Sequence, residues 1–157
     1  MSENTKSIHH FKLKLNGADK SLSDYKNQVL LIVNIASGCG FAPQLKELQE
    51  LTEEFGPQGF AVLGFPSNDF GRQEPLEGEA INKHCEVNHG VKFPVFEKIF
   101  VRGSDAHPLF QLLTQTSTPR WNFHKYLINK DGEVVDYFFP FTKPLSSKVK
   151  KKIQKLL

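Results

Sequence analysis

The sequence predicts an α/β fold in which a central mixed sheet is flanked by helices. Apolar residues follow two patterns along the 157 residues: continuous β-branched runs typical of buried strands, and runs with apolar positions three to four apart, typical of helices. A strand–helix–strand unit comes early, and two strands joined by an Asp-Gly turn come late. Because no repeat, low-complexity tract or linker interrupts the chain, we expect residues 1–157 to form a single domain.

The first half is a parallel crossover unit. "NQVLLIVNIAS" (27–37) and "GFAVLGFPS" (59–67) are continuous apolar runs, as strands buried on both faces should be. Between them, apolar residues recur at the spacing of one helix face. These are Leu45, Leu48, Leu51 and Phe55.

The second half contains three helix candidates and a hairpin. "GEAINKHCEVNHG" (78–90) is a weak helix former bounded by glycines, and "HPLFQLLTQ" (107–115) is a second candidate. "HKYLINKDGEVVDYF" (124–138) reads as two strands with an Asp-Gly turn, and the lysine-rich segment 148–157 is an amphipathic helix. A parallel crossover followed by an antiparallel hairpin is the arrangement of the thioredoxin-like fold.

Composition excludes several classes of function. The chain has 20 Lys and Arg against 17 Asp and Glu, and its net charge of +3 is too small to indicate a nucleic-acid partner. The N-terminal segment "MSENTKSIHHFKLKL" has no apolar run, so we expect no signal peptide, no stable membrane insertion and a cytoplasmic location. Two cysteines cannot form a disulfide framework, and a cytosolic disulfide is usually transient and catalytic.

One of the two cysteines occupies a position that favours reactivity. In "NIASGCGFAPQ" (34–44), Cys39 lies between two glycines and shortly before Pro43, which predicts an uncovered sulfur at the N-terminus of a helix. There the helix dipole and free N–H groups favour thiolate over thiol. A dithiol oxidoreductase would need a second cysteine three residues later, where this chain has Ala42.

Two later segments supply neutral hydrogen-bond donors for a reaction at such a thiolate. They are "FGRQEP" (70–75) with Gln73 and "RWNFHKYL" (120–127) with Trp121 and Asn122. Donors of this kind can stabilise charge that develops during attack on a peroxide. Taken singly, each of these residues is a weak signal, and a core tryptophan with a satisfied indole N–H is the more usual explanation for Trp121.

Three long segments together resemble the glutathione peroxidase family. "VNIASGCGFAPQ", "VLGFPSNDFGRQEP" and "WNFHKYLINKDGEVV" occur in the family's order and wording, and the resemblance runs from about Leu13 to the end of the chain. It implies a non-selenium member that reduces hydrogen peroxide and organic or lipid hydroperoxides without a cofactor. The implied catalytic tetrad consists of Cys39, Gln73, Trp121 and Asn122.

The resemblance also implies a resolving thiol. Cys85 would condense with the Cys39 sulfenic acid into a disulfide that thioredoxin reduces. Because a disulfide requires Cα atoms within about 7 Å, we expect the segment around Cys85 to unwind first. Two other interpretations remain open: Cys85 as an ordinary half-buried helix residue, and Cys85 as a metal ligand together with His84 and His89, although no second ligand pair is evident.

The sequence departs from the family pattern at a few positions. Ser67 stands where many non-selenium members carry a further cysteine, and Asp69 stands where Gln is more common. Gly38 replaces a larger residue, which predicts a looser loop before Cys39.

A subunit-contact loop of the tetrameric selenium members is absent, so we expect a monomer or small dimer with an open site. Arg72, Arg120 and Lys125 flank the tetrad positions in sequence and predict a positive rim.

Three functions remain open from the sequence. The first is a two-cysteine peroxidase recycled by thioredoxin, and the second is a one-cysteine peroxidase that uses glutathione. The third is a redox relay or sensor that passes the Cys39 oxidation to a partner protein. A catalytically silent binding module is disfavoured because all four tetrad residues are present.

Overall fold

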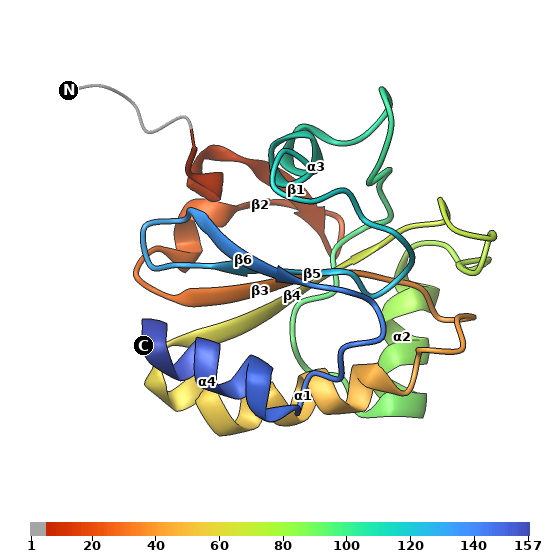
Figure 1. Ribbon diagram of the computed structural model, residues 1–157. Coiled ribbons are helices and arrows are strands. Elements are labelled where there is room, and N and C mark those ends of the chain that lie inside the picture. The colour runs from red at the N-terminus through yellow and green to blue at the C-terminus, as the bar shows by residue number, and fades with distance from the viewer. Residues whose placement is uncertain (1–5) are drawn as a thin grey trace.

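A four-stranded mixed sheet forms the centre of the protein, as a computed structural model of residues 6–157 shows (Figure 1). The strand order is β4-β3-β5-β6, with β3 parallel to β4 and antiparallel to β5, and β5 antiparallel to β6. The strands are β3 (Val29–Ile35), β4 (Phe60–Pro66), β5 (Lys125–Ile128) and β6 (Val134–Phe138). A separate antiparallel hairpin consists of β1 (Lys12–Leu15) and β2 (Ala18–Ser21).

Helices cover both faces of the sheet. Helices α1, α2 and α4 lie below the sheet in Figure 1, whereas α3 and the β1–β2 hairpin lie above it. The bounds are α1 (Gln44–Phe55), α2 (Glu79–His89), α3 (Pro108–Leu113) and α4 (Ser147–Leu156), with 3₁₀ helices at Ile8–His10, Leu22–Tyr25 and Gly56–Gln58. None of the helices within residues 6–157 has the length and hydropathy needed to span a membrane.

The central strand β3 contributes side chains to both hydrophobic cores. All seven of its residues are buried, and successive side chains of a strand point to opposite faces. Leu31 and Val33 pack in the core between the sheet and helices α1 and α4. Leu30 and Ile32 pack in the core between the sheet and α3. The continuous apolar run in the sequence therefore reflects a strand that is covered on both sides.

The structure confirms the predicted strands and helices of the sheet layers and adds an N-terminal hairpin that was not predicted. Gly132 adopts φ 84°, as the predicted Asp-Gly turn requires. In the added hairpin, Asn16 and Gly17 both have positive φ and form the turn between β1 and β2.

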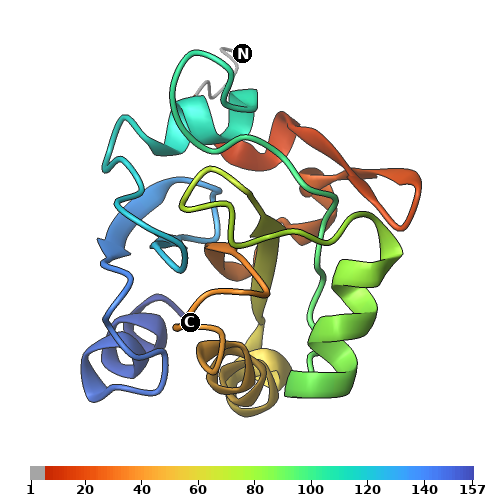
Figure 2. The ribbon, with the colours of Figure 1, turned by 90° about the vertical axis from the view of Figure 1, so that its right-hand side faces the viewer.

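Strand directions bring three loops to one end of the sheet. The carboxyl ends of the parallel strands β3 and β4 lie at the same edge as the start of the antiparallel strand β5. The loops that follow β3 and β4 and the segment that precedes β5 face the viewer in Figure 2. These are the three segments that carry the sequence motifs.

The stability of this fold should depend on pH through His124. Burial, together with the charges of Lys125 and Arg120, lowers the pKa of His124 from 6.5 to about 4. The folded protein thus keeps the imidazole neutral at pH values where the unfolded chain protonates it. The stabilisation is present in full above pH 6.5 and is lost as the pH falls toward 4.

We predict that His124→Gln flattens this dependence. Between these two pKa values, the free energy of unfolding of the wild type should fall by up to about 1.4 kcal/mol per pH unit more than that of the variant. Urea denaturation across this range measures the difference, and His10→Gln at an exposed position is the control. Parallel curves for wild type and His124→Gln would contradict the prediction.

Candidate functional site

Cys39 lies in a series of tight turns between β3 and α1. The N–H of Ala42 donates to the carbonyl of Cys39 (2.9 Å), and the N–H of Gln44 donates to that of Phe41 (2.8 Å). Helix α1 begins only at Gln44, with Pro43 as its N-cap residue, so the expectation that Cys39 sits at the helix N-terminus is wrong. The segment before Gln44 is bonded by turns from residue i to i+3, and Pro43 has no N–H with which to make the helical bond back to the Cys39 carbonyl.

Cys39 is buried, and its sulfur accepts one backbone hydrogen bond. Only 6% of the residue is exposed, so the prediction of an uncovered sulfur is wrong. The N–H of Phe41 lies 3.4 Å from Sγ. A backbone N–H aimed at sulfur can donate to negative charge that develops there during a reaction.

Gly38 brings the Cys39 turn against the Gln73 loop. Its N–H donates to the carbonyl oxygen of Gln73 at 2.7 Å. A Cβ atom at Gly38 would lie 2.7 Å from the same oxygen, which is closer than real contacts allow. The predicted loosening at Gly38 is therefore wrong, because glycine is what permits this close backbone approach.

The amide side chains of Gln73 and Asn122 are in direct contact. Asn122 Nδ2 donates to Gln73 Oε1 (3.2 Å) and, at 3.5 Å, to the carbonyl of Phe70. Because Gln73 accepts through its oxygen, its Nε2 group is left as a donor. The ring of Trp121 packs 5.7 Å from that of Phe70, and a Cβ at Gly71 would lie 2.9 Å from the indole.

Asn34 of β3 fixes the backbone that carries Trp121 and Asn122. Its side-chain Nδ2 donates to the backbone carbonyl of Trp121 (3.0 Å), and its backbone carbonyl accepts from the N–H of Phe123 (2.6 Å). Phe123 has φ 70°, a left-handed conformation that a bulky residue adopts only when surrounding contacts enforce it. The bonds from Asn34 supply that enforcement.

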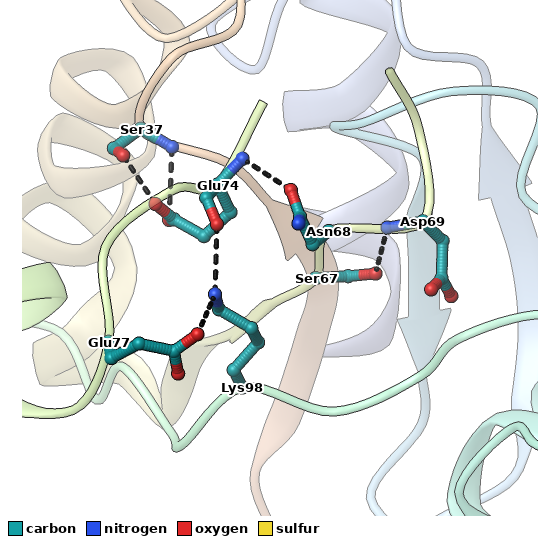
Figure 3. A network of polar contacts seen from close by, with 7 residues as sticks. All are labelled: Ser37, Ser67, Asn68, Asp69, Glu74, Glu77 and Lys98. Atoms are coloured by element: carbon teal, nitrogen blue, oxygen red, sulfur yellow. Dashed lines mark hydrogen bonds and ion pairs between the residues drawn. The ribbon is translucent and has the colours of Figure 1, made fainter. Parts of the chain in front are cut away.

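A buried carboxylate connects the Cys39 segment to the Gln73 loop from the other side (Figure 3). Glu74 is fully buried, and its carboxylate accepts hydrogen bonds from the N–H (3.0 Å) and the hydroxyl of Ser37. The Glu74 N–H donates to Asn68 Oδ1 (3.0 Å), and Lys98 Nζ donates to the Glu74 carbonyl and to Glu77, both at 2.8 Å. Gln73 and Glu74 are thus bonded to Gly38 and Ser37, the two residues that precede Cys39.

Ser67 and Asp69 have structural partners in this loop. The Ser67 hydroxyl accepts from the N–H of Asp69 at 3.1 Å (Figure 3). The Asp69 carboxylate accepts from the N–H of Val101 (2.7 Å), and Arg102 donates to the Asp69 carbonyl (2.7 Å). Asp69 therefore attaches the Gln73 loop to the segment that leads into α3.

Cys85 lies inside α2 as a buried thiol. Both cysteines are free, and Cys85 is only 1% exposed. Burial, with a further contribution from the nearby charge of Glu74, raises the pKa of Cys85 from 9.0 to about 12. The segment after α2 is held on α1 because the Gln49 side chain accepts from the N–H groups of Lys92 (2.8 Å) and Phe93 (3.2 Å).

The histidines near Cys85 do not form a metal site. The rings of His84 and His89 are 5.9 Å apart, and His84 is hydrogen-bonded to Asn88. Across residues 6–157, no group of three or more His, Cys, Asp and Glu side chains is arranged to hold a metal ion.

An apolar pocket of about 430 Å³ opens beside the Cys39 turn. Phe41 and Phe141 are exposed at its rim, and the Arg120 guanidinium lies 5.4 Å from the centre of the Phe139 ring. Such a pocket, apolar with one cation, suits an amphiphilic ligand. Its lining consists of Phe41, Arg120, Trp121, Phe139, Pro140 and Phe141.

The positive rim expected from the sequence is only partly present. Arg72 and Arg120 are exposed, but Lys125 is completely buried. Lys125 shares a face of β5 with Leu127, which belongs to the core between the sheet and helices α1 and α4. The Lys125 side chain therefore enters the protein interior.

Comparison with known proteins shows which family the chain resembles. Residues 8–114 match the family model described as glutathione peroxidase. The chain is 53% identical to the glutathione peroxidase homolog BsaA of Halalkalibacterium halodurans, over 96% of this chain and 99% of that protein. It is 44% identical to a hydroperoxy fatty acid reductase of Synechocystis sp., covering 91% of this chain and 90% of that protein.

Solved structures show the same fold. The crystal structure of Trgpx in apo form matches with a TM-score of 0.77 and 35% identity, over 96% of this chain and 95% of that one. A putative thioredoxin from Neisseria meningitidis matches with a TM-score of 0.66 and 18% identity, over 96% and 90%, which confirms the thioredoxin-like fold. The chain therefore belongs to the glutathione peroxidase family and is a peroxidase of the non-selenium bacterial type.

Proposed function

We propose that the Cys39 thiolate reduces hydroperoxides, with Gln73, Trp121 and Asn122 as hydrogen-bond donors. Sulfur attacks the terminal oxygen, the O–O bond breaks, and Cys39 becomes a sulfenic acid. The alkoxide or hydroxide that leaves takes a proton and departs as alcohol or water. The contact that supports this most strongly is the 2.7 Å bond from Gly38 to Gln73, because it joins the loop of the nucleophile to the loop of the donors.

The donors act where negative charge develops. In the resting site, Asn122 bonds to the oxygen of Gln73, which leaves Gln73 Nε2 available to the reacting atoms. The bonds from Asn34 and Glu74 fix both loops before substrate arrives, so little reorganisation is required during the reaction.

Resolution by Cys85 is the second part of the proposal. The Cys85 thiol would attack the Cys39 sulfenic acid, a disulfide would form, water would leave, and thioredoxin would return both residues to thiols. The high pKa and the burial of Cys85 keep it unreactive while α2 is folded. Local opening of α2, which is bounded by Gly78 and Gly90, is therefore part of the cycle.

The burial of Cys85 also favours a second candidate. If α2 stays closed, the sulfenic acid of Cys39 reacts instead with glutathione or with a thiol of a client protein. The first outcome is a one-cysteine peroxidase, and the second is a redox relay or sensor.

We further propose that bulky apolar hydroperoxides are substrates. The pocket beside Cys39 presents aromatic rings and one arginine, which suit an acyl chain and an anionic head group. The relative from Synechocystis sp. named a hydroperoxy fatty acid reductase supports this substrate class.

Coupled turnover tests the catalytic cycle. Peroxide-dependent NADPH oxidation should proceed with thioredoxin and thioredoxin reductase, and both Cys39→Ser and Cys85→Ser should reduce it to background. Glutathione with its reductase is the parallel arm. Full activity of Cys85→Ser with either reductant would replace the two-cysteine cycle with a one-cysteine cycle, and an inactive wild type would leave only the relay.

The close approach at Gly38 gives a second test. Gly38→Ala should displace the Gln73 backbone and slow the oxidation of Cys39 by peroxide about 10- to 100-fold. Gly40→Ala is the matched control, because Gly40 also adjoins Cys39 but has no atom within 4 Å of an added Cβ. Stopped-flow measurement of single-turnover oxidation gives both rates, and equal rates would contradict the role assigned to Gly38.

The pocket gives a third test. Phe141→Ala should raise the KM for cumene hydroperoxide several-fold, about 1 kcal/mol of lost contact, and leave the rate with hydrogen peroxide unchanged. Phe141 is 70% exposed, and Phe100→Ala, at a 60% exposed position outside the pocket, is the control. An equal effect on both peroxides would show that the pocket does not select substrate.

A further inference from the structure

Lys125 is a buried cation bonded only to backbone carbonyls. Its side chain has no exposed surface. Nζ donates to the carbonyl oxygens of Phe123 (2.8 Å), Pro140 (3.1 Å) and Phe139 (3.4 Å). An ammonium group has three N–H donors, so these three acceptors use its full capacity, as a buried charge requires.

The three carbonyls belong to two segments that border the site. Phe123 directly follows Trp121 and Asn122, whereas Phe139 and Pro140 form part of the wall of the apolar pocket. The carbonyl of Pro140 also accepts from Gln44 Nε2 at 2.8 Å. Gln44 is the first residue of α1, at the end of the turns that contain Cys39.

We propose that Lys125 is a positioning residue for the peroxidase reaction, because its ammonium group holds the Trp121–Asn122 backbone at a fixed place relative to the Phe139–Pro140 wall and the Cys39 turns. The proposal rests on the peroxidase mechanism above. Asn34 bonds to the same backbone from β3. Lys125 adds a connection that Asn34 does not make, through the Pro140 carbonyl to Gln44 of α1. Lys125 touches no reacting atom.

The charge state of Lys125 gives this role a pH dependence. Burial lowers the pKa of Lys125 from 10.5 to about 7, partly opposed by the charge of Glu47 on α1. A neutral amine keeps two N–H donors and turns a lone pair toward the remaining carbonyl, so one of the three bonds is lost. The neighbouring His124 does not change charge in this range, because burial lowers its pKa to about 4.

Tryptophan fluorescence provides a readout that does not depend on activity. Trp121 is the only tryptophan in the chain, so the emission spectrum reports its surroundings alone. The titration is run on Cys39→Ser, which removes the reactive thiol, with and without Lys125→Met, from about pH 6 to about pH 9. We expect an emission change centred near the pKa of Lys125 that disappears in the double variant.

The oxidation rate provides the second readout. Lys125→Met should slow single-turnover oxidation of Cys39 by hydrogen peroxide about tenfold or more, since a misplaced donor pair loses its alignment with the reacting atoms. Lys46→Met, at an exposed position on α1, is the matched control and should oxidise at the wild-type rate. Should Lys125→Met fail to fold, Gln44→Met removes only the bond to Pro140 and should change emission and rate in the same direction.

The outcomes are separable. An unchanged Trp121 emission spectrum, or an oxidation rate within about twofold of wild type, would overturn the positioning role. If hydrogen peroxide did not oxidise Cys39 in the wild type, the proposed function would be refuted instead. The emission comparison would then decide by itself whether Lys125 fixes the position of Trp121.

Discussion

The pairing of β3 with its two neighbours determines where the segments that carry the sequence motifs meet. A parallel partner on one side and an antiparallel partner on the other put the ends of β3 and β4 and the start of β5 at one edge. Segments distant in sequence meet there without a separate domain to hold them. Buried polar side chains such as Asn34 and Glu74 then fix the loops with hydrogen bonds to backbone groups.

Much of the fold could be predicted because its apolar periodicity is strong. Strands that are buried on both faces, and a helix with one apolar face such as α1, can be recognised from the local order of apolar residues alone. The β1–β2 hairpin was missed because its strands are four residues long and carry charged side chains, so they show little alternation. The turn residues Asn16 and Gly17 were the available signal.

The motifs predicted which segments carry the candidate site residues but not what holds these segments together. Asn34 lies in an apolar strand and bonds to a residue 87 positions away, a partner that no local pattern indicates. Lys125 was expected at the surface because lysine is rarely buried without compensation. Its compensation comes from backbone carbonyls, which have no signature in the sequence.

The fully formed helix around Cys85 has a kinetic consequence. If Cys85 must leave α2 before it reacts, the free energy of opening that helix determines how long the sulfenic acid of Cys39 persists. A longer lifetime gives a second peroxide molecule time to carry the sulfur to the irreversible sulfinic state, and gives other thiols time to intercept it. In the proposed two-cysteine cycle, the stability of α2 would thus set the balance between turnover, inactivation and signalling.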